Sequence, residues 1–125
     1  ASAACSTALR CGVRPQDVVL GWVPGAWELP VAAATALASG KWDAVVALGC
    51  LIRGQTLHYE LIAREAAKGL ANLQLEHRVP VTFGVLTVDS LEDATHRLGG
   101  KFGNKGGECM LAAIEQARML ESLTK

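Results

Sequence analysis

The sequence predicts an α/β fold in which a parallel sheet lies between two layers of helices. Short apolar runs typical of buried strands alternate along the chain with longer, Ala-rich stretches that have helical spacing. Strands joined by helices form right-handed crossovers, which give a parallel sheet covered by helices on both faces. The 125 residues contain no internal repeat and no low-complexity linker, so residues 1–125 are interpreted as a single domain.

The first part of the chain is interpreted as helix, strand, helix and strand. Residues 1–11 carry apolar side chains at helical spacing, and an apolar run at 18–23 between turn sequences predicts a strand. An Ala-rich helix is expected over 28–39. Residues 44–48 form a short continuous apolar run, the pattern of a strand buried on both faces.

The second part continues the alternation. A helix is predicted over 57–76, and Gly69 on its apolar stripe suggests close approach to a neighbouring element. A buried strand is predicted over 79–88, and capping residues after it indicate a helix over 89–99. A Gly-rich link at 103–107 is expected to lead into the last helix.

Only three strands are predicted, and the alternation opens on a helix. A strand is expected before that helix, so either an N-terminal strand lies outside this sequence or another chain supplies its place. The domain is therefore expected to be N-terminally incomplete.

The charge and hydrophobicity of the chain indicate which kinds of molecule it could bind. Twelve basic and twelve acidic side chains cancel, which removes the electrostatic argument for nucleic acid or an anionic membrane surface. No apolar run reaches the length of about eighteen residues that a membrane span needs. Because half of the residues are hydrophobic, more apolar surface is expected than a small domain hides, and this favours a homo-oligomer.

The four cysteines, at positions 5, 11, 50 and 109, form no CxxC pair and have no histidine at ligand spacing. They are interpreted as buried thiols rather than disulfides or metal ligands. Such thiols suit a reducing compartment, so we expect a cytoplasmic location in a microbe, or a plastid location in a plant.

The strongest candidate site is the stretch 49–60, where an apolar strand ends in a Gly-bounded turn and a helix follows. Gly54, Gln55 and Thr56 offer backbone N–H groups and a hydroxyl to an anion, without the lysine of a P-loop, and Thr56 could cap the helix. A His58 in the first helical turn would be kept neutral by the helix dipole and could act as a general acid or base. The alternative is a surface or capping histidine.

Four further side chains are candidates, each with a simpler explanation. Arg97 could clamp a phosphate, from another part of the fold or a second subunit, or it could only complement a helix dipole. Lys105 is by default a solvated lysine. Trp27 and Glu28 could hold a planar ligand with a polyol arm, although a tryptophan beside a turn is more often a packing anchor. The residues alone indicate a metal-free site for a planar small molecule bearing a phosphate or polyol.

Four blocks, in this order and spacing, carry a family resemblance over nearly the whole chain from Gly12 onward. VPGAWELP at 23–30, GCLIRGQTLH at 49–58, FGVLT at 83–87 and GNKG at 103–106 resemble the 6,7-dimethyl-8-ribityllumazine synthases. That family has a flavodoxin-like three-layer sandwich. The resemblance implies that 5-amino-6-(D-ribitylamino)uracil condenses with 3,4-dihydroxy-2-butanone 4-phosphate, releasing phosphate and water, with no metal or organic cofactor.

The resemblance also implies roles for residues of one subunit. His58 matches the proton-transfer histidine, and Gly54, Gln55 and Thr56 lie in the matching phosphate-binding turn. Trp27 falls where the family usually has a phenylalanine beside the pyrimidine ring. Glu28 matches the residue that binds the ribityl chain. Cys50, Leu51 and Ile52 match the strand end whose backbone lines the pocket.

Three more matching residues come, in the family, from a neighbouring subunit: Phe83, Arg97 on the phosphate and Lys105 near the ring. The resemblance implies pentamers, or icosahedral shells of pentamers, with active sites between subunits; the compact stretch 99–106 favours the shell. The family's first strand, which ends in an aromatic residue that stacks on the ring, has no counterpart here.

Three other functions remain open. An archaeal-type riboflavin synthase, related in fold, would consume the lumazine, but the block at 49–58 argues against it. A lumazine-binding or shell-forming protein that has lost catalysis would not need His58, Arg97 and Lys105. A flavodoxin-like mononucleotide-binding module would be expected to carry a Ser/Thr-rich phosphate loop, which the chain lacks.

Overall fold

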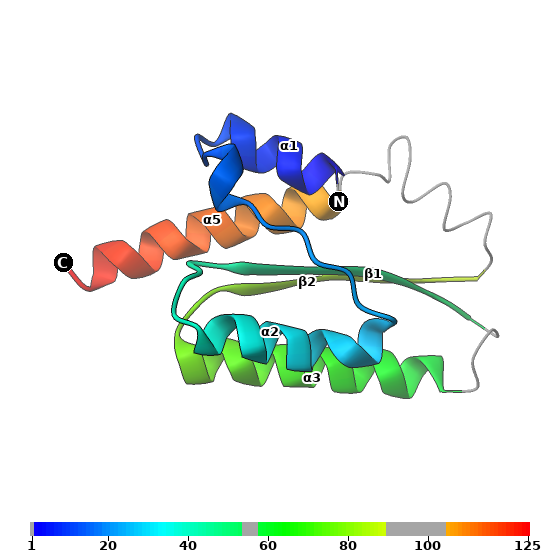
Figure 1. Ribbon diagram of the computed structural model, residues 1–125. Coiled ribbons are helices and arrows are strands. Elements are labelled where there is room, and N and C mark those ends of the chain that lie inside the picture. The colour runs from blue at the N-terminus through cyan, green and yellow to red at the C-terminus, as the bar shows by residue number, and fades with distance from the viewer. Residues whose placement is uncertain (1, 54–57, 90–104) are drawn as a thin grey trace.

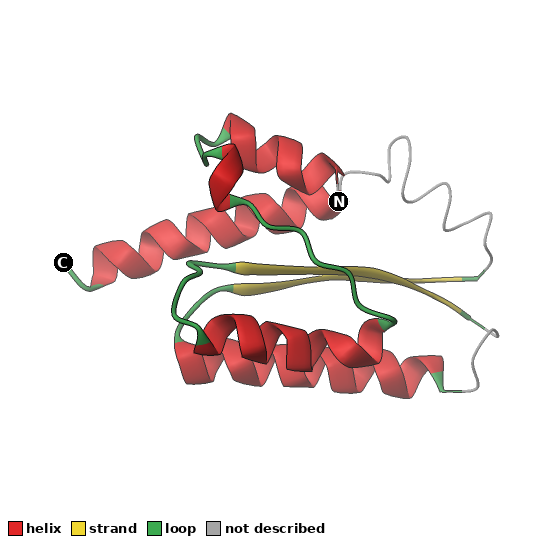
Figure 2. Ribbon diagram, viewed as in Figure 1, coloured by secondary structure: helices red, strands yellow, loops and turns green. Residues whose placement is uncertain are grey.

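The computed structural model describes residues 2–53, 58–89 and 105–125, arranged in three layers (Figure 1). Two strands form the middle layer, α1 and α5 lie on one side of them, and α2 and α3 lie on the other (Figure 2). The fold is therefore the predicted three-layer α/β/α sandwich of the flavodoxin-like kind. The elements are α1 (Ser2–Arg10), the 3-10 helices η1 (Pro15–Asp17) and η2 (Ala26–Glu28), α2 (Leu29–Ala38), β1 (Val45–Ile52), α3 (Tyr59–His77), β2 (Val81–Val88) and α5 (Lys105–Leu123).

The helices at 1–11, 28–39 and 57–76 and the strand at 79–88 are confirmed to within two residues at each end. The predicted helix at 89–99 lies outside the described residues, apart from Asp89.

The two strands of the sheet run parallel, as predicted. They pair in register from Val45 opposite Val81 to Ile52 opposite Val88. β1 continues to Ile52, past the end of the predicted run. The prediction that it is buried on both faces was wrong, because Ala47 is its one fully buried residue and the others are half-buried. The reason is that β1 is an edge strand in the described part of the chain.

The strand predicted at 18–23 is also wrong. The backbone is extended at Val18, with φ −109° and ψ 117°, but the segment pairs with no strand in the described ranges. The segment runs past the sheet, from the layer that contains α1 to the layer that contains α2 (Figure 1). Its Val19 and Trp22 side chains are 68% and 83% exposed. An apolar run gives a segment the tendency to extend, whereas a strand also requires a hydrogen-bonded neighbour.

The strand order of flavodoxin-like sheets, 2-1-3-4-5, accounts for this unpaired segment. In that order the first strand lies between the second and the third. Residues 18–23 stand in the place of the second strand in the chain, and β1 stands in the place of the third. A further strand between them stays a prediction.

The outer edge of β1 has backbone groups available for such a strand. The N–H of Val45 donates to Pro80 C=O at 2.9 Å, and the N–H of Arg53 donates to Val88 C=O at 2.6 Å. Bonding groups of a strand alternate between its two sides, so the N–H groups of Val46 and Leu48 point away from β2.

We expect the amides of Val46 and Leu48 to exchange with solvent at least about tenfold faster than that of Ala47, whose N–H points toward β2. Hydrogen exchange followed by NMR on the 125-residue chain measures this difference. Equal protection of all three amides would show that another strand or a second copy covers the edge.

The core between the sheet and the α2/α3 layer centres on Leu70 of α3, which is 1% exposed. It clusters with the buried side chains of Ala33, Leu37, Ala47 and Val81.

The close approach predicted at Gly69 is confirmed. A Cβ at this position would lie 3.1 Å from Cβ and Cγ of Pro30, closer than ordinary van der Waals contact, so the glycine helps α3 to pack closely on α2.

The layer on the other face depends on small residues. Ala8 of α1 and Ala113 of α5 are completely buried. The predicted link at 103–107 was partly wrong, since α5 already begins at Lys105 and its first turn contains Gly106 and Gly107. A Cβ at Gly107 would lie 2.9 Å from Thr7 Oγ1 of α1. Here the glycines allow two helices to approach, although glycine costs a helix about 1 kcal/mol relative to alanine.

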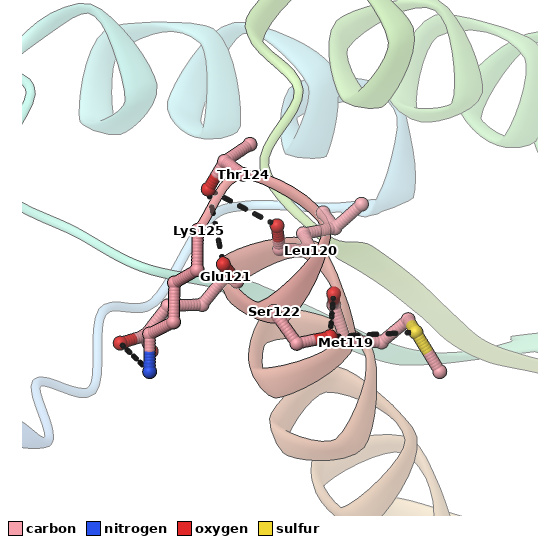
Figure 3. Close-up of polar contacts among 6 residues, drawn as sticks. All are labelled: Met119, Leu120, Glu121, Ser122, Thr124 and Lys125. Atoms are coloured by element: carbon pink, nitrogen blue, oxygen red, sulfur yellow. Dashed lines mark hydrogen bonds and ion pairs between the residues drawn. The ribbon is translucent and has the colours of Figure 1, made fainter.

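At its other end, α5 closes with side-chain hydrogen bonds to carbonyl groups of the last turn (Figure 3). Ser122 Oγ donates to Met119 C=O at 2.7 Å, and Thr124 Oγ1 donates to Glu121 C=O at 3.0 Å. Lys125 Nζ lies 3.7 Å from a carboxylate oxygen of Glu121. The Thr124 hydroxyl thereby bonds one of the last four carbonyl groups, which a helix end leaves without the usual intrahelical partner.

Candidate active site at the carboxyl ends of the strands

The candidate site lies at the edge of the sheet where both strands end. α3 begins at this same edge, beside the carboxyl ends of β1 and β2, whereas α5 begins farther back, over the middle of the strands (Figure 1). In open α/β sheets, ligands bind outside the carboxyl ends of the strands, where helix N-termini present N–H groups. The fold therefore brings the N-terminus of α3 to the edge where the sequence places its first candidate residues.

His58 occupies the N-cap position of α3, with φ −119° and ψ 27°. The prediction that it lies within the first turn, with Thr56 as the cap, was wrong by two positions, because the helix begins at Tyr59 rather than at residue 57. Its C=O accepts the N–H of Ile62 at 2.9 Å, while its side chain makes no capping hydrogen bond. The imidazole is therefore attached at the positive end of the helix dipole without being used to close the helix.

Arg53 directly follows β1 and contacts the ends of two other elements. Its Nε lies 3.2 Å from Oδ1 of Asp89, just after β2. Its Cζ lies 5.4 Å from the ring centroid of Tyr59, the first residue of α3. A cleft of about 560 Å³ lies here, lined by Arg53, Tyr59, Glu60, Ala63, Arg64 and Thr87.

The charges around this cleft act on the Tyr59 phenol. Desolvation raises the pKa of Tyr59, and its hydrogen bond to Glu60 Oε1, at 3.0 Å, raises it further. The Arg53 guanidinium lowers this pKa, in opposition to both. The phenol therefore stays protonated at neutral pH and donates to Glu60.

Other predicted site residues lie on the elements that reach this edge. Cys50, Leu51 and Ile52 form the last part of β1, half-buried and directly before Arg53. Trp27 lies in η2 and is 60% exposed. Glu28 is the N-cap residue of α2, and it too makes no side-chain capping hydrogen bond.

Lys105 and Phe83 are placed differently from each other. Lys105 is the first residue of α5, where its charge lowers the pKa of the Cys109 thiol against the larger, raising effect of burial. Phe83 lies in the middle of β2 opposite Ala47 and packs against the core cluster. Within one chain, Phe83 is therefore not brought to the strand ends where His58 lies.

Gly54, Gln55, Thr56 and Arg97 lie outside the described residues. The arrangement that sequence reasoning missed is Arg53 with Tyr59 and Asp89. Arg53 and Tyr59 stand inside the stretch 49–60, so a charged residue directly after an apolar strand was the available signal.

The interpretation of the cysteines as buried thiols was right for Cys109 and wrong for Cys5, Cys11 and Cys50, which are half-buried. Among the described helices, none is both long enough and apolar enough to cross a bilayer.

Comparison with known proteins extends this picture. Residues 1–121 match the family described as 6,7-dimethyl-8-ribityllumazine synthase. The chain is also 54% identical over 115 residues to the 6,7-dimethyl-8-ribityllumazine synthase of Aquifex aeolicus (strain VF5), a match that spans 92% of this chain and 75% of that protein. With its three-layer fold and a histidine where a helix begins beside the strand ends, the chain belongs to the 6,7-dimethyl-8-ribityllumazine synthase family.

Proposed function

We propose that this chain is a transferase that condenses 5-amino-6-(D-ribitylamino)uracil with 3,4-dihydroxy-2-butanone 4-phosphate. The products are 6,7-dimethyl-8-ribityllumazine, phosphate and water, in the penultimate step of riboflavin biosynthesis. The observation that carries the proposal is the 54% identity to a named synthase over 92% of the chain.

The reaction requires several proton transfers. The uracil amine attacks the ketone and one water leaves, which gives a Schiff base. Phosphate is then expelled, and the ribitylamino nitrogen attacks the remaining carbonyl carbon, closing the ring with loss of a second water. We assign the proton transfers to His58, because it stands at the N-cap of α3 beside the strand ends.

Much of the rate is expected to come from holding two substrates in one orientation. Well-oriented reactants can save on the order of 7 to 11 kcal/mol of the barrier in the best cases. Here the proposed pocket uses the backbone of Cys50, Leu51 and Ile52, with Trp27 beside the pyrimidine ring and Glu28 on the ribityl chain. Gly54, Gln55 and Thr56 are proposed to bind the phosphate.

Mixing the two substrates with the protein tests the proposal. We expect lumazine absorbance to rise together with released phosphate in equal molar amounts. A protein that only binds lumazine would release no phosphate. An archaeal-type riboflavin synthase would instead consume added lumazine, so either of these results would replace the proposed reaction.

We further propose that each active site is shared by two subunits of a pentamer or of a shell of pentamers, with Phe83, Arg97 and Lys105 coming from the neighbour. Two observations support this. Phe83 lies apart from His58 within one chain. Large apolar side chains are exposed on α3 and α5, among them Leu61, Leu75, Leu111 and Met119. Mass measurement of the intact assembly distinguishes a monomer from a pentamer and from a shell. A cytoplasmic or plastid location also stays a proposal.

Mixing two inactive variants tests the shared site directly. We expect His58→Ala and Arg97→Ala proteins to be nearly inactive alone. Unfolded and refolded together in equal amounts, they should recover about a quarter of the wild-type activity, because each intact site forms where two particular neighbours meet. The control is each variant refolded alone. No recovery from assemblies shown to be mixed would place both residues in the same subunit's site.

A further inference from the structure

We propose that Arg53 is a positioning residue that fixes the start of α3, and with it His58, relative to the ends of both strands. We call Arg53, Tyr59 and Asp89 together the Arg53 clasp. The inference rests on the proposed function for the role of His58, and it adds a residue to which the family resemblance assigned no role.

Arg53 is connected to three elements at one edge of the sheet. It follows the last residue of β1, and its backbone N–H donates to Val88 C=O at 2.6 Å at the end of β2. Its guanidinium holds Asp89, at 3.2 Å, and lies over the Tyr59 ring, at 5.4 Å. A planar guanidinium can bond a carboxylate with its edge while its face stacks on an aromatic ring.

The Tyr59 ring is held from its other end as well. Its hydroxyl donates to Glu60 Oε1 at 3.0 Å, so both the face and the hydroxyl of this side chain have a partner. Tyr59 is the residue directly after His58, and a fixed ring restricts the backbone on which the imidazole stands. The orientation of His58 thus depends on a contact made by Arg53 from the end of β1.

The clasp is poorly placed to serve stability. The Arg53 and Asp89 side chains are 61% and 75% exposed, and ion pairs this exposed contribute little to folding. The guanidinium is also already paired with Asp89, which makes it a weaker phosphate ligand than an unpaired arginine would be. We therefore assign to Arg53 the orientation of His58, because a small error in the orientation of a reacting group lowers the reaction rate strongly.

The chain offers a matched control. Arg14 and Asp17 form an ion pair of similar exposure at 2.7 Å, in η1 and the residue before it, on the side of the sheet covered by α1. Arg14→Gln removes the same charge and the same kind of exposed pair as Arg53→Gln, but it touches neither strand end nor α3.

The experiment measures kcat and the KM of each substrate for the wild-type protein and five single variants, each in its assembled form. We expect Arg53→Gln and Tyr59→Leu each to lower kcat on the order of tenfold with little change in either KM. Tyr59→Phe keeps the ring and should lie closer to wild type than Tyr59→Leu. Arg53→Lys keeps a charge near Asp89 but loses the planar face, so it should recover only part of kcat. Arg14→Gln should match wild type.

The double variant Arg53→Gln/Tyr59→Leu tests whether the two residues act together. If they do, its kcat should be no lower than that of the worse single variant, since the second change removes a contact that is already lost. Independent effects, in which the two factors multiply, would overturn the clasp. A rise in KM for the butanone phosphate with kcat unchanged in Arg53→Gln would also overturn it, because Arg53 would then bind substrate.

A second readout does not depend on activity. The Ile62 N–H donates to the His58 C=O and reports on the first turn of α3. We expect hydrogen exchange at Ile62 to be at least about fivefold faster in Arg53→Gln than in wild type, and unchanged in Arg14→Gln. Unchanged exchange in Arg53→Gln refutes the clasp even if the enzyme is active. Absence of lumazine formation by the wild type refutes the proposed function instead.

Discussion

Replacing His58 with alanine is expected to lower turnover by about 10²- to 10⁴-fold while leaving the affinity for the lumazine product nearly intact. The imidazole is proposed to move protons between reacting atoms, and removing it takes away that path without removing the walls of the pocket. Because the His58 side chain does not cap α3, its loss should not destabilise the start of that helix. Steady-state turnover and fluorescence titration with the product measure the two quantities.

His77→Ala is the matched control, because this histidine lies in the last turn of the same helix, at the opposite end of the sheet from the carboxyl ends of the strands. It should retain wild-type turnover. If His58→Ala loses turnover and product affinity to the same degree, the residue binds the ligand or holds the pocket together, and the proton-transfer role is refuted.

Leu70→Ala is expected to lower the free energy of unfolding by about 2 to 5 kcal/mol. Leu70 is 1% exposed and lies where α2, α3 and both strands meet, so truncation leaves a cavity that no single element can close. Urea denaturation followed by circular dichroism measures the change, on assemblies of equal concentration so that subunit association does not enter the comparison.

Leu75→Ala on the same helix is the control for Leu70→Ala. This leucine is 76% exposed, and its truncation should change the free energy of unfolding by less than about 0.5 kcal/mol. Equal losses in the two variants would mean that Leu75 is buried in the assembly to the same degree as Leu70 is buried in the chain.

The helices could be predicted from the sequence because their signal is local. Ala and Leu side chains recur at helical spacing in α1, α2 and α3, and Gly69 on the stripe of α3 correctly indicated a close neighbour. The start of α5 was missed because its first turn contains Gly106 and Gly107. From sequence alone, consecutive glycines predict a loop, and only the packing of α1 against them shows why they lie in a helix.

Strand pairing was harder to predict because it is not local. Residues 18–23 and 45–52 are both apolar runs, but only the second finds a neighbour in the described part of the chain. For the candidate site, His58 stood out because a strand, a glycine and a helix start surround it. Arg53 did not, since its partner Asp89 follows a different strand and only the fold brings the two together.

In the described part of the chain no strand covers the outer edge of β1, and this bears on how the chain behaves before and during assembly. Native sheets protect their edges with charged residues, prolines or bulges, and Val45–Ile52 contains no charged residue and no proline. A strand of another chain could pair along this edge in place of the further strand predicted there, which makes the edge a template for aggregation. Refolding yield should therefore fall as protein concentration rises, since intermolecular pairing competes with closure of the sheet.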